Sequence, residues 1–266
     1  MHRSGIITLL TDFGLADGYV ASMKGVMLGV HASAQLIDVS HEVEPQNVGA
    51  GAFLLQAHYR YFPAGTVHLA VVDPGVGSAR AALACQANGH YFVAPDNGLL
   101  DFCLDGPDLQ AVWLTQKKFW RHTVSSTFHG RDIFAPVAAH LARGAPLSQF
   151  GEPFRLQRRL AVLPVQITGK TLNGQVAYID RFGNLVSNIS AQRLQEFSQD
   201  QPITVMLDGH LIGGLCKTYA DVPPQSPLTL LGSFGFLEIG VNLGNAQAHF
   251  AARAGAPITI RRGQMI

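Results

Sequence analysis

Four short polar segments of this 266-residue chain carry acid, base, guanidinium and amide side chains at the points where apolar runs end. They are residues 11–14 (TDFG), 73–80 (DPGVGSAR), 128–132 (FHGRD) and 180–184 (DRFGN). Open α/β sheets place their binding sites beyond the carboxyl ends of the strands. Side chains that converge on such an edge can share acid-base chemistry, so these segments predict an active site.

Four residues of the first half are the main candidates for catalysis and binding. Asp73 and Arg80 flank a glycine-rich turn that can return the guanidinium to the carboxylate as a charge-assisted pair, although a purely structural ion pair is the alternative. His129 stands on a glycine-containing loop before an expected helix, a position that favours a catalytic role. Asp12 ends a strand, where it either stabilises the turn or accepts both hydroxyls of a ribose.

Two other interpretations of these segments are weaker. The spacing Gly75-x-Gly77-x-x-Arg80 resembles a dinucleotide fingerprint but lacks its third glycine. A metal site is the second alternative, and no H-x-H or H-E-x-x-H spacing supports it. Its ligands would be Asp12, Asp73, His129 and Asp132.

Composition narrows the class of protein. Apolar residues make up 47% of the chain, charged residues only 14%, and the net charge is +1 without a run of Lys or Arg. Nucleic-acid and membrane-surface partners are therefore not expected, because phosphate binding needs clustered basic charge. The three scattered cysteines predict neither a disulfide framework nor a zinc site, and they favour a reduced, cytoplasmic protein. No apolar stretch approaches the roughly 20 residues of a membrane span.

The first part of the chain alternates strand and helix patterns. This alternation predicts an α/β sandwich with a mostly parallel sheet. Strands are expected at residues 6–10, 36–39, 66–72 and 91–94. Helices are expected after a cap at Asp17, at residues 48–59, and from Asp132 to Arg143 with Gly144 beyond its end.

The pattern changes near a basic stretch at residues 155–159. We therefore expect an α/β catalytic domain at residues 1–155, a linker at 156–163 and a smaller all-β barrel or sandwich domain that binds substrate at 164–266. Short strands are expected at residues 174–179, 203–207 and 257–260, a helix near 191–197, and turns at 172–174 and 208–209.

Two features of the second domain suggest a ligand. Asp180, Phe182 and Asn184 offer an acid, a flat ring and an amide in one turn, which suits a ligand with a cation, an aromatic ring and hydrogen-bonding edges. A plain turn needs only Gly183 and one of the polar residues. Glu238 interrupts an apolar run, and a buried carboxylate needs partners.

In this order, the segments resemble the S-adenosyl-L-methionine hydroxide adenosyltransferase family, relatives of the fluorinating and chlorinating enzymes that act on the same substrate. The resemblance implies an N-terminal α/β domain, a C-terminal β-barrel and a homotrimer whose substrate sites lie at subunit interfaces. It covers essentially the whole chain, with matching stretches at residues 11–25, 38–55, 71–80, 94–100, 126–144, 178–189 and 232–246.

The resemblance also implies a role for each candidate. Asp73, Arg80 and His129 match a catalytic triad, Asp12 matches a ribose-binding acid, and Phe128 matches an aromatic residue beside the reacting centre. In the second domain, Phe182 and Asn184, with backbone at 242–246, match an adenine site. Asp180 and Ser233, together with Glu238, match the methionine end, although Gly232 stands where the family usually has Asn.

The implied reaction is attack of water or hydroxide on C5′ of S-adenosyl-L-methionine, giving adenosine and L-methionine, with no cofactor and no metal. His129 is the expected proton acceptor. The halide-using relatives carry Tyr at the position of His129, and the fluorinating type has hydroxyl side chains at the positions of Val76 and Gly130. The alternatives are a metal-dependent hydrolase and a non-catalytic protein that binds S-adenosyl-L-methionine or adenosine.

Overall fold

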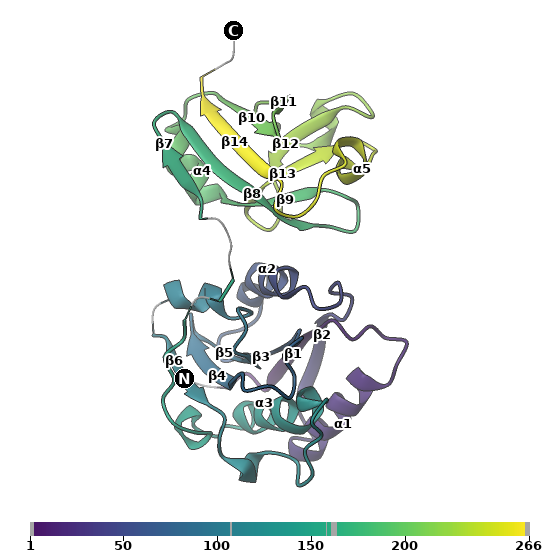
Figure 1. The fold of residues 1–266 in the computed structure, drawn as a ribbon, viewed down its shortest axis with the longest axis vertical. Helices are drawn as coiled ribbons and strands as arrows, with labels where there is room; N and C mark the ends of the chain where they lie inside the picture. Colours follow the sequence, from purple (N-terminus) through teal and green to yellow (C-terminus); the bar gives the residue numbers. More distant parts are fainter. Residues whose placement is uncertain (1–2, 107, 158, 161–163, 264–266) are drawn as a thin grey trace. The chain divides into compact units, whose positions relative to one another are not determined.

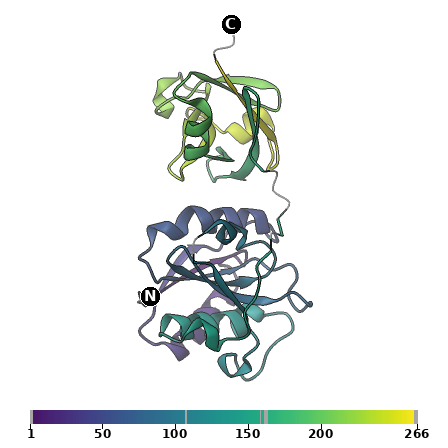
Figure 2. The same cartoon turned by 90° about the vertical axis from the view of Figure 1, so that its left-hand side faces the viewer.

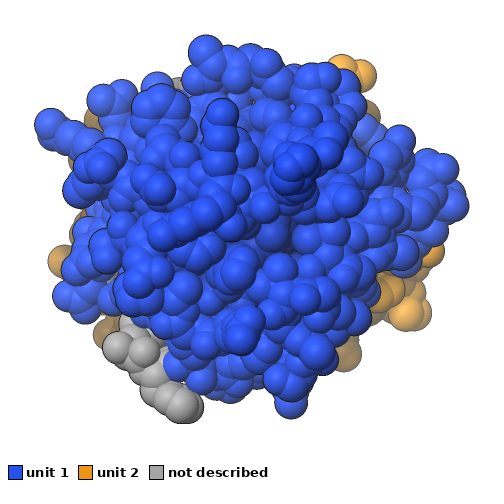
Figure 3. Space-filling model, turned by 90° about the horizontal axis from the view of Figure 1, so that it is seen from below, with its two compact units in different colours: residues 1–160 blue, residues 161–266 orange. Residues whose placement is uncertain are grey.

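The computed structural model describes residues 3–106, 108–157, 159–160 and 164–263. The chain divides into two compact units, residues 1–160 (unit 1) and 161–266 (unit 2), coloured blue and orange in Figure 3. Part of the linker expected at 156–163, namely residues 158 and 161–163, lies outside the described residues. None of the helices in the described ranges has the length and apolar content that a membrane span requires.

Unit 1 is built on a six-stranded sheet in the order β2-β1-β3-β5-β4-β6. The pairs β1–β2, β1–β3 and β3–β5 are parallel, whereas β4 runs antiparallel to both of its neighbours. Its elements are β1 (Ile6–Thr11), α1 (Tyr19–Val30), β2 (Gln35–Ser40), α2 (Val48–His58), η1 (Tyr59–Tyr61), β3 (Val67–Val71), β4 (Ala82–Ala87), β5 (His90–Pro95), η2 (Asp101–Asp105), β6 (Gln110–Trp113), η3 (Lys117–Phe119), η4 (Gly130–Phe134), α3 (Ala135–Ala142) and η5 (Leu147–Gln149).

Helices cover both faces of this sheet. Figures 1 and 2 show α2 on one face, with α1 and α3 together on the other. Every residue of β3 and β5 is buried, as is typical of strands covered on both sides. The predicted α/β fold is confirmed. The strands β4 and β6 were not predicted, because one is rich in alanine and the other has only four residues.

Two local predictions in unit 1 are wrong. Helix α1 begins at Tyr19 with Gly18 as its N-cap and without a side-chain cap, so Asp17 does not cap it. The helix expected from Asp132 starts earlier, as the π-helical turn η4, and continues as α3. Asp132 is unavailable as a cap because its carboxylate accepts hydrogen bonds from Arg121 and Arg131.

Unit 2 is an antiparallel, nearly closed β-barrel, which confirms the predicted all-β domain. Its strand order is β11-β10-β14-β8-β9-β13-β12, and a bridge between Leu215 and Thr229 links the two ends. Its elements are β7 (Gln166–Thr168), β8 (Thr171–Ile179), β9 (Leu185–Ser190), α4 (Ala191–Ser198), β10 (Ile203–Leu207), β11 (His210–Gly213), η6 (Tyr219–Asp221), β12 (Pro227–Leu231), β13 (Phe236–Val241), α5 (Ala246–Phe250) and β14 (Pro257–Arg262).

Only one of the two turns predicted in unit 2 is present. Asp208 and Gly209, both with positive φ, join β10 to β11. The turn predicted at 172–174 lies inside β8. Gly174 is required there for another reason: a Cβ atom would lie 2.6 Å from the side chain of Asn188, because β8 and β9 approach closely.

Candidate active site

The first two acids of the candidate site leave the same edge of the unit 1 sheet. β1 and β3 are parallel neighbours with Thr11 opposite Val71, so Asp12 and Asp73 follow adjacent strand ends. This is the placement that the sequence predicts for a site at the carboxyl edge of a parallel sheet.

Asp73, Arg80 and His129 form one hydrogen-bonded cluster. Arg80 donates from Nε to Asp73 Oδ1 at 2.9 Å and from Nη2 to Asp73 Oδ2, a bidentate pair. The same Nη2 lies 3.0 Å from Nδ1 of His129. The Arg80 and Asp73 side chains are only 10% and 5% exposed. The structure thus brings together three residues from separate segments of the chain.

Gly77 allows the loop between Asp73 and Arg80 to pack beside the segment that leads to His129. It has a φ of +78°, and a Cβ atom on it would lie 2.5 Å from the carbonyl oxygen of Ser126. At Gly75, by contrast, a Cβ atom would make only ordinary contact, 3.5 Å from Arg80 Cγ. Gly77 therefore has a packing role in place of a role in a dinucleotide fingerprint.

The contact with Arg80 determines which ring nitrogen of neutral His129 carries the proton. A guanidinium has donors only, so Nδ1 of His129 must accept, and neutral His129 carries its proton on Nε2. Burial, and then the positive charge of Arg80, lower the pKa of His129 below its usual range, although Asp73 and Asp132 oppose this shift. His129 is therefore neutral at pH 7 and can accept a proton.

Asp132, one of the alternative metal ligands, is fully buried, and both of its carboxylate oxygens already accept hydrogen bonds. Its oxygens accept from the side chains of Arg121 and Arg131 and from the backbone of Ser125. Burial alone would raise its pKa, but these bonds lower the pKa of Asp132 to about 2. Among the described residues, no group of three or more His, Cys, Asp or Glu side chains is arranged to hold a metal ion. Asp132 instead fixes the loop that carries His129.

An aromatic cluster adjoins His129. Phe128 packs edge-on against Phe13 and Tyr19, with ring centroids 5.9 and 5.2 Å apart. These rings line a pocket of about 410 Å³ together with Ser125, Thr127 and Arg131. Phe128 is a predicted site residue, whereas no role was predicted for Phe13 or Tyr19. The position of Phe13 next to Asp12 was the available signal.

Asp12 is held by one of its two carboxylate oxygens. Oδ2 accepts from the backbone N–H of Gln46 at 2.8 Å. Oδ1 has no hydrogen-bond partner among the residues that the structure describes, so it can accept from a ligand hydroxyl.

In unit 2, all five predicted binding residues line a single pocket of about 810 Å³. They are Asp180, Phe182, Asn184, Ser233 and Glu238. Asp180 uses three hydrogen bonds inside its own turn. Its Oδ1 accepts from the backbone of Phe182 and Asn184, and its Oδ2 accepts from the Asn184 amide. The Asn184 amide is thereby oriented, while the Phe182 ring is 75% exposed.

Glu238 is the buried acid of this pocket. The Tyr219 hydroxyl, which the sequence analysis missed, donates to its Oε1. Burial and the charge of Asp180 raise the pKa of Glu238, and the bond from Tyr219 opposes this shift. A Cβ atom at Gly232 would collide with Oε2 of Glu238. Glycine at position 232 therefore leaves room for the Glu238 carboxylate.

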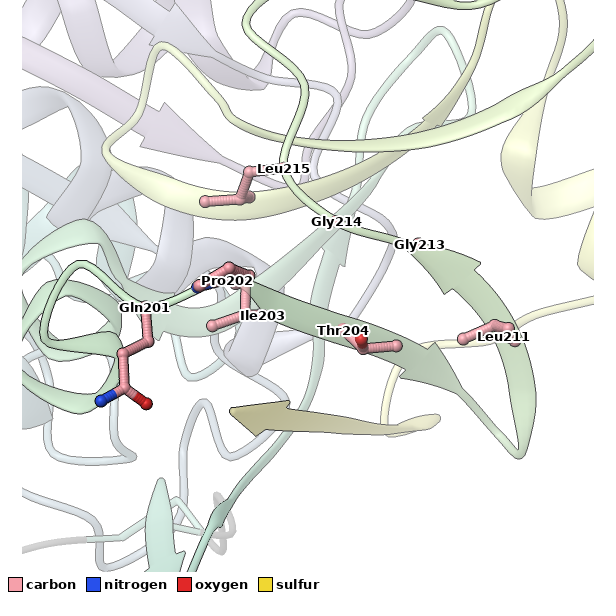
Figure 4. Close-up of a pocket in the computed structure, with 8 residues that line it drawn as sticks. All are labelled: Gln201, Pro202, Ile203, Thr204, Leu211, Gly213, Gly214 and Leu215. Atoms are coloured by element: carbon pink, nitrogen blue, oxygen red, sulfur yellow. The ribbon is translucent and has the colours of Figure 1, made fainter. Parts of the chain in front are cut away.

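A second hollow in unit 2 contains none of the predicted residues. It measures about 470 Å³ and lies where β11 diverges from β10, beside Leu211 and Leu215 (Figure 4). Its described lining residues include no acid, base or Cys.

In this chain an α/β unit with an Asp–Arg–His cluster at its sheet edge is followed by a β-barrel, and both units match models of one enzyme family. Residues 7–151 match the model of the SAM hydroxide adenosyltransferase N-terminal domain, and residues 174–259 match that of the C-terminal domain. The chain belongs to the SAM (S-adenosyl-L-methionine) hydroxide adenosyltransferase family, as the sequence analysis predicted.

Relatives and solved structures agree with this assignment. The chain is 39% identical to an (R)-S-adenosyl-L-methionine hydrolase of Salinispora arenicola, covering 97% of this chain and 98% of the relative. It is 28% identical to a fluorinase of Actinoplanes sp., covering 97% of each. A crystal structure of an uncharacterized conserved protein from Thermotoga maritima, 37% identical, superposes with a TM-score of 0.90 over 96% of this chain and 100% of the other.

Proposed function

We propose that this protein hydrolyses S-adenosyl-L-methionine to adenosine and L-methionine by attack of water at C5′. The observation that carries the proposal is the contact of one guanidinium with both a carboxylate and a neutral imidazole. Relatives that are 39% and 36% identical to this chain are (R)-S-adenosyl-L-methionine hydrolases, which supports the choice of substrate.

The difficult part of this reaction is activation of the nucleophile, not departure of the leaving group. The C5′–S bond breaks as the new C5′–O bond forms, and the sulfonium leaves as a neutral thioether that needs no proton. One proton of the water is released overall. Water reacts slowly at saturated carbon, so the site must align it and accept that proton. Positioning alone can contribute about 7–11 kcal/mol in favourable cases.

Each member of the cluster suits one part of this demand. In the attack a water would accept a hydrogen bond from Arg80 Nη2 and donate to Nδ1 of His129, so Nδ1 must first exchange its direct 3.0 Å contact with Nη2 for this water. His129 then takes the proton, while the guanidinium stabilises the developing hydroxide. Asp73 orients the guanidinium and offsets its charge, which matters once His129 becomes cationic.

The other residues hold the substrate. Asp12 accepts the ribose diol through its available oxygen, and Phe128 lies beside the reacting carbon. Phe182 and Asn184 take the adenine by stacking and by hydrogen bonds. Asp180, Ser233 and Glu238 hold the methionine end, and Asp180 also orients the Asn184 amide that takes the adenine. No cofactor or metal ion is needed for these roles.

We also propose a homotrimer in which unit 1 of one subunit and unit 2 of the next complete each site. The resemblance to the family, which implies substrate sites at subunit interfaces, supports this. Co-expressing a His129→Ala variant with an Asn184→Ala variant should give mixed oligomers with activity that neither variant has alone, and mixed oligomers without activity contradict the shared site. The free thiols Cys85, Cys103 and Cys216 support a cytoplasmic location.

The direct test is incubation with the separated (R) and (S) sulfonium epimers, followed by chromatography of the products. We expect adenosine and L-methionine in equal amounts, and we expect Asp73→Ala, Arg80→Ala and His129→Ala each to lower kcat far more than substrate affinity. Activity lost to a chelator and restored by a divalent ion would favour the metal-dependent alternative. Tight binding without adenosine release over hours would favour a binding protein.

A further inference from the structure

Four polar side chains next to Asp12 form a chain of contacts that the proposed mechanism does not use. Lys24 Nζ on α1 lies 2.6 Å from Asp38 Oδ2 on β2. Asp38 Oδ1 lies 3.0 Å from Nε2 of His41, and Nδ1 of His41 lies 2.8 Å from the Thr11 hydroxyl. His41 is 3% exposed and Thr11 is fully buried, so neither can touch a substrate.

The direction of these contacts follows from their chemistry. The Asp38 carboxylate favours a proton on Nε2 of His41, although the ring N–H is not aligned well enough for a hydrogen bond. Nδ1 then accepts from the Thr11 hydroxyl. The hydroxyl oxygen is left to accept from the backbone N–H of Phe13, at 3.3 Å. Each donor is therefore matched to one acceptor, and the chain of contacts ends on the turn that carries Asp12.

The segment that begins at His41 holds this turn from its other side as well. The His41 carbonyl accepts from Gly14 N–H at 2.8 Å. Gln46 donates its backbone N–H to Asp12 Oδ2 and has a φ of 66°, which is unusual for a residue other than glycine. Unusual backbone of this kind persists where its surroundings impose it, often at ligand sites.

We propose that Asp38, His41 and Thr11 are positioning residues that orient the Asp12 carboxylate toward a vicinal diol of the ligand. The inference rests on the role of Asp12 in the proposed function. Lys24 offsets the charge of Asp38 at the outer end of the chain of contacts. Loss of the Thr11 hydroxyl leaves the Phe13 N–H and His41 without their partner and lets the Asp12 turn move.

The test compares adenosine with 2′,3′-dideoxyadenosine, which lacks the diol, by titration calorimetry. Thr11→Val keeps the shape of the side chain and removes the hydroxyl. We expect it to weaken adenosine binding by at least about tenfold, the size of one hydrogen bond to a charged group. Dideoxyadenosine binding should stay within about twofold, and Thr11→Ser should restore adenosine binding. In turnover, KM for S-adenosyl-L-methionine should rise more than kcat falls.

The chain offers a matched control on the same strand. Thr8 is buried, and its hydroxyl lies 2.8 Å from Nδ1 of another histidine, His68. Thr8→Val should therefore leave both nucleoside affinities unchanged.

If Thr11→Val lowers the affinity for both nucleosides equally, the proposal is overturned, because the effect is then structural and not specific to the diol. A wild-type protein that binds both nucleosides equally also overturns it. Failure to release adenosine from S-adenosyl-L-methionine contradicts the hydrolase function, yet the predicted binding pattern would still support the positioning role.

Discussion

Gly77→Ala is the substitution that most directly tests how the loop geometry supports catalysis. The new Cβ atom would lie 2.5 Å from Ser126 O, whereas ordinary contact begins at 3.4 Å, so the two segments must separate by about 0.9 Å. Transmitted in full to the cluster, this shift would lengthen the 3.0 Å contact between Arg80 and His129 to at most about 3.9 Å, beyond hydrogen-bond range. A displacement of about 1 Å can cost on the order of 10²-fold in rate.

Gly89→Ala is the matched control for this experiment. Gly89 has a φ of +77°, almost the same as Gly77, but nothing lies within 4 Å of its added Cβ atom. The left-handed backbone costs each variant about 1–2 kcal/mol of stability, measured by urea unfolding. We expect kcat for adenosine release to fall about 10²-fold in Gly77→Ala and to stay within about twofold in Gly89→Ala. Equal turnover in the two variants would refute the argument that the Ser126 contact sets the Arg80–His129 distance.

Three further changes probe the cluster, the core and the second pocket. Arg80→Lys keeps the positive charge but loses the two-pronged guanidinium, so kcat should fall by about 10²-fold or more with little change in KM. Arg193→Lys, at an exposed ion pair, is the control and should have no effect. Normal turnover in Arg80→Lys would remove the bidentate guanidinium from the mechanism. Burial, and then the charge of His90, lower the pKa of His68 to about 3. Between pH 6.5 and pH 3 the unfolded chain therefore binds a proton at His68 that the folded protein does not bind. The free energy of unfolding should fall as the pH is lowered from about 6.5 toward 3. In His68→Gln this decline should be shallower in urea titrations, and an unchanged slope contradicts the assignment. Gly232→Ala should displace the Glu238 carboxylate and raise KM more than it lowers kcat, and an unchanged KM would show that the displaced acid does not hold the substrate.

The sequence predicted the residues that form the Asp73–Arg80–His129 cluster better than the residues that support them. Asp73, Arg80 and His129 were predictable because acids and bases at strand ends and on glycine-rich loops have few structural reasons to be there. The contact of Tyr219 with Glu238 and the contact of His41 with Thr11 were not predictable, because each joins residues that are distant in the sequence.

The strands, too, were predicted where residue type alone indicates them and missed where they depend on pairing. Strands with long apolar runs, such as β3, were predicted from residue type alone. The strands β4 and β6 form through pairing with their neighbours, which short or alanine-rich segments do not reveal. Gly174 suggested a turn, but its small size serves close packing between two strands.

The most direct test of the central claim is the fate of the oxygen atom when the protein acts on S-adenosyl-L-methionine in ¹⁸O-water. If water held by Arg80 and His129 attacks C5′, mass analysis will find one heavy oxygen on the 5′ position of adenosine and none in the methionine. Unlabelled adenosine, or label in an amino-acid product beside methylthioadenosine, would contradict the account.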